Sequence, residues 1–408
     1  MNKNFKQFEK AGIIFVMEQA AKYGFTYDNQ GWCNLGQGAA EAGEINGNLD
    51  RITELKIGEL EQGYAPVAGR KKLRENIAGM YNDLFRAKIE SKYSFENIAV
   101  AGGGRVAISR VVACLKNIKI GYFVPDYSSY EGILAGFNNV EACPIFLEAK
   151  DNFKIDVELI KTEIKKQNLQ AILFSNPSNP TGNVLHGDNL KNLLDFAREN
   201  KILLIIDEFY FNYIYFDNKD FVSVAEYITD IDTDSVILIS GLSKSWRYSG
   251  FRICWTVGPR DMTENIAAAG SFLDGGANNP LQKAAEQIIS KDAIIQESKA
   301  IKNNFLVKRD FVVSSLEKLG LKIVGESNGA FYVWASVENL SEKINTGDKF
   351  FEACLQEKVI VVPGKFFDLN PGKTRTEKRF DNLVRFSYGP TLKTIKKGIE
   401  AIERVVNL

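Results

Sequence analysis

Near the middle of this 408-residue chain lies the segment Ser243-Lys244-Ser245-Trp246-Arg247-Tyr248-Ser249-Gly250-Phe251-Arg252. It follows an apolar run that is typical of a strand. A lysine amine can form a Schiff base with an aldehyde. The Ser243 hydroxyl and the planar, always-charged guanidinium of Arg252 are suited to hydrogen-bond phosphate oxygens. The segment therefore predicts a covalent site for a phosphorylated aldehyde.

A second polar group follows another apolar run. Residues 201–206 are typical of a buried parallel strand, and Asp207 comes at its carboxyl end. Ligands of open α/β sheets bind beyond such strand ends. A carboxylate there can keep a pyridine nitrogen protonated, which makes the ring an electron sink. Tyr210 lies three residues further on and can reach a ring hydroxyl. The alternative is that Asp207 only caps the next secondary-structure element.

A loop with two Asn-Pro pairs, Asn176-Pro177-Ser178-Asn179-Pro180-Thr181-Gly182, follows the expected strand 171–175. The two pairs force an extended, turn-rich path. That path presents the Asn179 amide rigidly at a strand end, where it can donate to the same ring hydroxyl. An ordinary loop is the alternative, but two Asn-Pro pairs closed by Thr-Gly are unusual for one.

Two further segments each follow an expected strand. In Gly102-Gly103-Gly104-Arg105, glycines before a helix expose backbone N–H groups, which cradle phosphate with help from the helix dipole. In residues 125–130, Tyr127 can stack on a ring. A flexible turn and a core aromatic are the respective alternatives. All of these segments fit one cofactor, pyridoxal phosphate (PLP).

The chain resembles the fold-type I PLP-dependent enzymes of the class I and II aminotransferase family. The resemblance runs from Asn34-Leu35-Gly36-Gln37-Gly38 through residues 64–74 to Arg385-Phe386-Ser387. It implies an α/β fold whose large domain, residues 46–298, holds a mostly parallel seven-stranded sheet between helices. A smaller α+β domain would comprise residues 1–45 and 299–408. The alternation of strands and helices between residues 97 and 258 independently indicates a doubly wound sheet.

The resemblance also implies an activity and a role for each motif residue. The activity is transfer of an amino group from an L-amino acid to a 2-oxo acid, in a homodimer with shared active sites. Catalysis is assigned to Lys244, Asp207 and Tyr210. Arg385, Gly38 and Asn179 would hold the substrate, Arg385 by its α-carboxylate. The residues expected to hold the cofactor are Gly103, Gly104, Arg105, Tyr127, Asn179, Asp207, Tyr210, Ser243, Lys244, Arg252 and the partner subunit's Tyr64.

The composition limits the binding partners and the cellular compartment that can be expected. The chain has 51 basic and 51 acidic residues, which argues against nucleic acid or an anionic membrane as the main partner. No apolar stretch is long enough to span a membrane. The apolar run 11–17 has no small-residue cleavage site and predicts no signal peptide. The five cysteines show no paired metal spacing, which predicts reduced thiols, a cytoplasmic protein and no metal site.

Acidic residues near the expected site keep a second function open. Asp274 stands in a glycine-flanked segment that family members often contribute to the neighbouring active site, and Glu41 and Glu44 closely follow Gly38. Because a guanidinium pairs bidentately with carboxylates, Asp274 is a candidate ligand of a cationic substrate such as arginine. The alternative is that these three acids are simply exposed to solvent and bind no substrate. With residues 34–38, the pattern resembles the arginine-modifying branch of the fold, such as capreomycidine synthase, which performs elimination, cyclisation or oxidation.

Gly241 stands where the family usually has serine, three residues before the lysine. A non-enzymatic role, such as the effector domain of a regulator, is disfavoured because the lysine, aspartate and arginines are all present. The sequence leaves the amino donor and the oxo-acid acceptor open.

Overall fold

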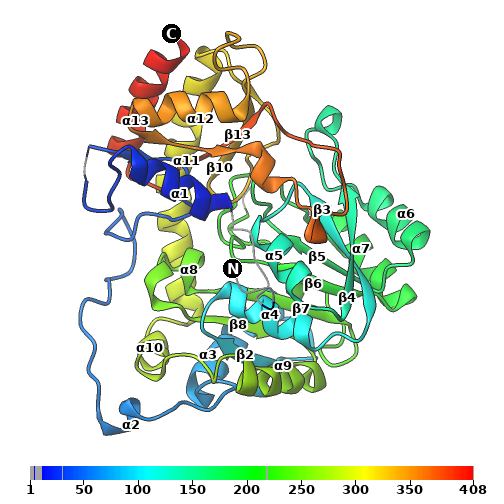
Figure 1. Ribbon diagram of the computed structural model, residues 1–408. Helices are drawn as coiled ribbons and strands as arrows, with labels where there is room; N and C mark the ends of the chain where they lie inside the picture. The colour runs from blue at the N-terminus through cyan, green and yellow to red at the C-terminus, as the bar shows by residue number, and fades with distance from the viewer. Residues whose placement is uncertain (1–3, 5–11, 30, 217–218, 408) are drawn as a thin grey trace.

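The computed structural model describes residues 4, 12–29, 31–216 and 219–407 (Figure 1). Its centre is a seven-stranded sheet made of β2 (Ile98–Ala101), β3 (Ile118–Val124), β4 (Val140–Phe146), β5 (Ala171–Ser175), β6 (Leu203–Asp207), β7 (Val236–Gly241) and β8 (Cys254–Val257). The strand order is β2-β8-β7-β6-β5-β3-β4. Only β8 is antiparallel to its neighbours, and the other strands run parallel. The predicted mostly parallel seven-stranded sheet is confirmed.

Helices cover this sheet because their apolar residues recur at helical spacing. In α7, for example, Leu190, Leu193, Leu194 and Ala197 are buried on one face. Helix α4 packs against β2, β7 and β8, α6 against β4, and α7 against β6. The helices of this part of the chain are α3 (Lys71–Phe85), α4 (Gly104–Ala113), α5 (Ser129–Gly136), α6 (Val157–Gln167), α7 (Gly187–Asn200) and α9 (Arg260–Leu273).

Most of the remaining strands and helices form a second group, drawn in the upper part of Figure 1. A four-stranded antiparallel sheet has the order β12-β13-β10-β9. Its strands are β9 (Lys322–Ile323), β10 (Tyr332–Ser336), β12 (Val362–Pro363) and β13 (Leu383–Ser387). The helices are α1 (Gly12–Lys22), α11 (Lys291–Lys318), α12 (Gly347–Gln356) and α13 (Leu392–Val406).

The N-terminal part of the chain joins this second group. Strand β1 (Cys33–Asn34) pairs in parallel with β11 (Val359–Ile360). This pairing supports the predicted small domain, although the boundaries at residues 45 and 298 stay predictions. Of the apolar run 11–17 discussed above, residue 11 lies outside the described residues, and the rest begins α1.

Short helices complete the chain. They are α2 (Glu59–Gln62), α8 (Leu242–Ser245) and α10 (Asn279–Ala285), with 3-10 turns at η1 (Phe95–Asn97), η2 (Ala149–Asp151), η3 (Val224–Glu226), η4 (Ser249–Phe251), η5 (Gly364–Phe367) and η6 (Pro371–Lys373). Helix α8 starts directly after β7. A Cβ on Gly241 would lie 2.6 Å from the Cα of Cys254 and 2.8 Å from the carbonyl oxygen of Ile253. The close approach of β8 therefore explains glycine here.

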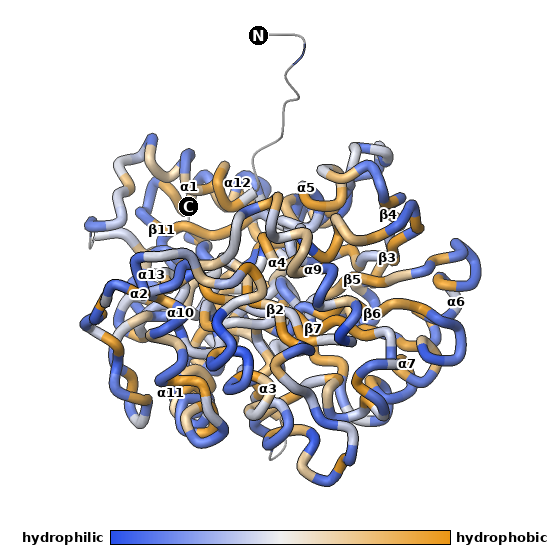
Figure 2. The backbone as a smooth tube through the Cα atoms, turned by 90° about the horizontal axis from the view of Figure 1, so that it is seen from below, coloured by the Kyte–Doolittle hydropathy of each residue, from blue (hydrophilic) through white to orange (hydrophobic). Residues whose placement is uncertain are grey.

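The distribution of hydropathy agrees with this layering. Figure 2 shows central strands that are largely apolar and outer turns that are hydrophilic. All five cysteines are free thiols. No helix in the described part of the chain is long and apolar enough to cross a membrane.

Candidate active site

The carboxyl ends of the central strands open into a cavity of about 480 Å³. Parallel strands in register end at one edge, and Ser175 at the end of β5 is level with Asp207 at the end of β6. The second group closes the opposite wall with β13 and the segment after β1. The predicted residues that line the cavity are Gly38, Gly104, Arg105, Tyr127, Asn179, Asp207, Tyr210, Ser243, Lys244, Arg252 and Arg385.

Lys244 projects into this cavity from the short helix α8. Its Nζ donates to the carbonyl oxygen of Gly38. Desolvation, followed by the positive charges of Arg385, Arg252 and Arg105, lowers the pKa of Lys244 to about 8. A larger fraction of the amine is therefore neutral and nucleophilic near neutral pH than at an ordinary lysine.

Asp207 is buried beneath the same cavity. Tyr130 in the first turn of α5 donates its hydroxyl to Oδ2 at 2.9 Å, and the Phe209 N–H donates to Oδ1 at 3.3 Å. Desolvation raises the pKa of Asp207 to about 6, against the opposing effect of these hydrogen bonds and of Lys244. The carboxylate is thus mostly ionised at pH 7, and no described cation forms an ion pair with it. A protonated pyridine nitrogen fits this environment.

Tyr130 is a site residue that the sequence did not single out. Its position three residues after Tyr127, in the first turn of a helix beyond a strand end, is the only sequence feature that points to it.

A phosphate cradle lies beside the lysine. Gly103 has φ 123°, a conformation that favours glycine, and a Cβ there would lie 2.1 Å from Nη2 of Arg252. Helix α4 begins at the next residue, so its free N–H groups face the same space. Arg252 Nη1 donates to Ser243 Oγ at 3.2 Å. This donor set, with its cationic side chain, fits the phosphate of PLP.

Arg385 faces Lys244 from β13 and is 4% exposed. Its Nη1 donates to Asn179 Oδ1 at 2.8 Å, and its Nη2 donates to the carbonyl oxygen of Gly36 at 2.5 Å. Both acceptors are neutral, and Nε has no partner. Burial lowers the pKa of this guanidinium. A buried cation without a carboxylate partner in the described structure fits an anionic group of the substrate.

Tyr210 lines the same cavity as Lys244 and Arg385. Its hydroxyl is 2.6 Å from that of Tyr332, and both side chains are buried. The Tyr332 ring also lies 4.3 Å from the Arg385 guanidinium carbon. The sequence indicated only a strand around Tyr332, because a fully buried strand does not reveal which face meets a site.

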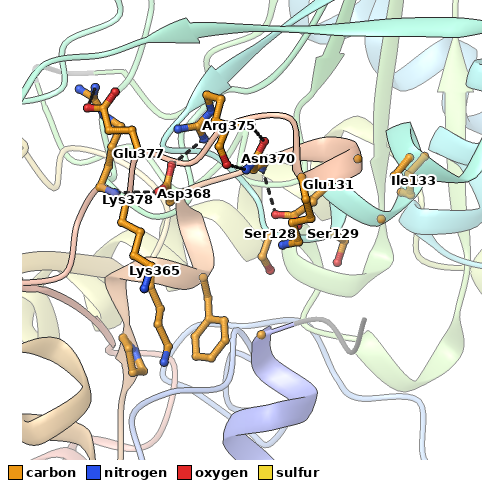
Figure 3. Close-up of a pocket in the computed structure, with 18 of the residues that line it drawn as sticks. Ser128, Ser129, Glu131, Ile133, Lys365, Asp368, Asn370, Arg375, Glu377 and Lys378 are labelled. Atoms are coloured by element: carbon orange, nitrogen blue, oxygen red, sulfur yellow. Dashed lines mark hydrogen bonds and ion pairs between the residues drawn. The ribbon is translucent and has the colours of Figure 1, made fainter. Parts of the chain in front are cut away.

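A second, outer cavity of about 1120 Å³ adjoins the first and shares Arg105 and Ser128 with it. Figure 3 shows its walls, formed by α5 and the loop that carries η5 and η6. The loop is tied to α5 because Lys373 pairs with Glu131 at 2.6 Å. At the junction, Arg105 Nε donates to the Tyr127 hydroxyl at 3.1 Å. The Arg105 side chain thus lies against Tyr127, while its backbone stays in the first turn of α4.

Four residues that the sequence singled out, one tyrosine and three acids, do not line the inner cavity of this chain. Tyr64 is 100% exposed. The Asp274 carboxylate, expected to offer itself to a cationic substrate, receives Arg110 Nε at 2.7 Å and Nη2 at 2.5 Å. Glu41 pairs with Lys308, and Glu44 is exposed outside the cavity lining. In this chain two of the three acids are therefore paired with distant basic residues, and the third lies outside the cavity.

No group of three or more His, Cys, Asp or Glu side chains in the described residues is arranged to hold a metal ion.

Comparison with known proteins decides the family. The model of the family described as aminotransferase class I and II matches residues 31–402. The chain belongs to the class I and II aminotransferase family. A probable aspartate/prephenate aminotransferase of Aquifex aeolicus is 28% identical over 363 residues, which cover 88% of this chain and 87% of the relative. A 1-aminocyclopropane-1-carboxylate synthase 6 of rice, Oryza sativa subsp. japonica, is 29% identical and covers 80% of this chain and 62% of the relative.

Solved structures agree on the fold. The aspartate aminotransferase from Thermus thermophilus with maleate superimposes with a TM-score of 0.78 at 21% identity, over 97% of each chain. The protein is a PLP-dependent aminotransferase whose substrates are an amino acid and a 2-oxo acid. The arginine-modifying alternative finds no support in these comparisons or in the placement of Asp274.

The lowered pKa of Lys244 makes a prediction for PLP capture by this lysine, the role that the sequence motif predicts for it. Because the neutral amine attacks the aldehyde, the rate of PLP capture by the apoenzyme should rise about tenfold between pH 7 and pH 9 and then level off. An ordinary lysine would give a continuous rise over this range, without a plateau. Stopped-flow absorbance of PLP binding measures the profile. A rate still rising steeply above pH 9 would contradict the lowered pKa.

Proposed function

We propose that Lys244 carries PLP and that the enzyme transaminates an acidic amino acid such as aspartate or glutamate. When bound, PLP supplies an electron sink for the bond-breaking step at the substrate Cα. In this proposal Asp207 keeps the pyridine nitrogen protonated, and Tyr127 stacks on the ring. The phosphate is held by Ser243, Arg252 and the backbone of residues 103–105.

The chain's own residues also bind the substrate and move the proton. Arg385 would hold the α-carboxylate through its unpartnered Nε and the remaining N–H groups of its two Nη atoms. The oxygen of the Asn179 amide accepts from Arg385, so its NH₂ group would be free to donate to the ring hydroxyl, together with Tyr210. Lys244, whose amine lies in the cavity, would serve as the general base that moves the proton at the substrate Cα.

One observation supports an acidic substrate. Arg105 is exposed at the junction of the two cavities and has no carboxylate partner among the described residues; its one hydrogen bond there is to Tyr127. A substrate held at Arg385 with its side chain directed outward brings a second carboxylate toward Arg105. Relatives named as aspartate aminotransferases agree with this choice.

Arg105→Gln tests the acidic substrate. We expect kcat/KM for aspartate and glutamate to fall about tenfold, because a charge-assisted hydrogen bond at a solvent-exposed site is lost. The value for alanine should change by less than about twofold. Lys365→Gln is the matched control, since Lys365 lines only the outer cavity. An equal loss for alanine and aspartate would assign Arg105 to the phosphate, as the sequence pattern suggested.

We further propose a homodimer that shares its active sites. Large apolar side chains around α2 and the end of α9 face solvent in the single chain: Leu60 at 84% exposure, Phe272 at 74% and Tyr64 at 100%. In Figure 1 the segment that carries α2 extends away from the body of the molecule. A second copy of the chain would bury this surface and receive Tyr64 at its phosphate. The free thiols support a cytoplasmic location.

Hybrid dimers test the sharing of sites. Lys244→Ala and Tyr64→Ala chains should each be inactive or nearly so. After subunit exchange in equal amounts, about one quarter of wild-type activity per chain should return, because half the dimers are hybrids with one complete site. Sedimentation velocity establishes the dimer. A fully active monomer, or no recovery on mixing two folded variants, would contradict the proposal.

A further inference from the structure

A buried ion pair lies directly beneath the lysine-bearing turn. Arg247 follows Lys244 by three residues, and its backbone N–H donates to the Lys244 carbonyl oxygen at 2.9 Å. Its Nε donates to Glu297 Oε1 on α11 at 2.7 Å, and both side chains are fully buried. Arg247 also adopts φ 58°, which is unusual for a non-glycine residue.

The same guanidinium holds a segment of distant backbone. Nη1 of Arg247 donates to the carbonyl oxygen of Glu41 at 2.9 Å and to that of Gly43 at 2.6 Å. The Glu41 carboxylate is held in turn by Lys308 on α11. Residues 41–43 are therefore fastened to the lysine turn and to α11 at once.

The residues just before this segment lie in the site. Two of them contact the proposed machinery: the Gly36 carbonyl accepts from Arg385 Nη2, and the Gly38 carbonyl accepts from Lys244 Nζ. The neighbouring residue Leu35 is hydrogen-bonded to β13, because the Ser387 N–H donates to the Leu35 carbonyl oxygen at 2.6 Å. Residues 35–43 thus bridge the strand that bears Arg385 and the turn that bears Lys244.

Stability alone does not account for this arrangement. Replacing a buried ion pair by apolar residues is often neutral or stabilising, and here Arg247 Nη2 and Glu297 Oε2 are both buried without a partner. The guanidinium instead bonds Glu297 through Nε and both carbonyls through Nη1, a fixed arrangement that a lysine cannot reproduce.

We propose that Arg247 is a positioning residue that fixes residues 36–43 against the Lys244 turn and thereby sets the geometry of the α-carboxylate subsite. The proposal rests on the assigned roles of Lys244 and Arg385. Arg247 touches neither substrate nor cofactor and acts through the backbone of Gly36 and Gly38.

The test separates positioning from stability with a double variant. Arg247→Met removes the close partner of the buried Glu297, leaving only Arg51 at 3.9 Å, and should lower the melting temperature. Arg247→Met/Glu297→Met removes both charges and should recover most of it. Two readouts follow: amide hydrogen exchange of residues 36–44 in the apoenzyme, and the ratio of half-reaction rates with L-alanine and with ethylamine, which lacks the α-carboxylate.

We expect the double variant to keep faster exchange at residues 36–44 and to lose at least about tenfold in the alanine-to-ethylamine ratio. Arg51→Met is the matched control: Arg51 lies 3.9 Å from Glu297 and bonds the Trp246 and Arg247 carbonyls but not the segment 36–43. It should lower stability and keep the ratio.

The outcomes distinguish this inference from the proposed function. A double variant with wild-type exchange and a wild-type ratio overturns the role of Arg247 alone. A wild-type enzyme that carries PLP on another lysine, or that does not prefer alanine to ethylamine, overturns the proposed function and this inference with it.

Discussion

Replacing Lys244 with alanine is expected to lower turnover by at least about 10⁴-fold. The variant loses both the covalent attachment of PLP and the general base. No other lysine lines the inner cavity among the described residues, so no neighbouring amine can take over. Borohydride reduction of the wild-type holoenzyme should fix PLP on the peptide that contains Lys244, and mass spectrometry identifies that peptide.

Two variants control this experiment. Lys244→Arg keeps a positive charge in the cavity but cannot form the covalent bond, and it should be as inactive as the alanine variant. Lys365→Ala removes a lysine of the outer cavity, which pairs with Asp348 at 2.7 Å, and should stay active. Label on a lysine other than Lys244 in the wild-type enzyme would contradict the assignment.

Replacing Arg385 with lysine is expected to weaken every amino-acid substrate about ten- to a hundredfold. The loss corresponds to about 1.5–3 kcal/mol for a bidentate, charge-assisted pair. The reason is geometric: two of the arginine nitrogens are held by Asn179 and Gly36, and a lysine cannot keep these contacts while it binds a carboxylate. Substrate dependence of the half-reaction, followed by absorbance, gives the affinities.

A comparison of substrates makes this prediction specific. Arg385→Lys should weaken alanine, aspartate and glutamate alike, since all carry the α-carboxylate. Arg252→Lys, at the phosphate cradle, should instead weaken the retention of PLP during dialysis. Selective loss of acidic substrates in Arg385→Lys would place the side-chain carboxylate at Arg385 and refute the assigned orientation.

Much of the fold and of the cofactor site was predictable because the decisive features are local in the chain. The apolar runs that became β5 and β6 end at Ser175 and Asp207, and parallel strands place such ends at one edge. The glycines before α4 and the paired Asn-Pro bonds before Asn179 likewise shape their own backbone. Each of these features needs only a few consecutive residues to be recognised.

The sequence by itself thus determined a parallel α/β sheet, a lysine and a carboxylate at its edge, and the family's cofactor. Only the tertiary structure decided the partners of the charges. Asp274 meets Arg110 and Glu41 meets Lys308, so acids that looked available to a cationic substrate are neutralised. Tyr332 reaches Tyr210, and Arg247 reaches residues 41–43. The physical reason is that the energy of a buried charge depends on groups brought close by the packing of distant elements, which no local pattern records.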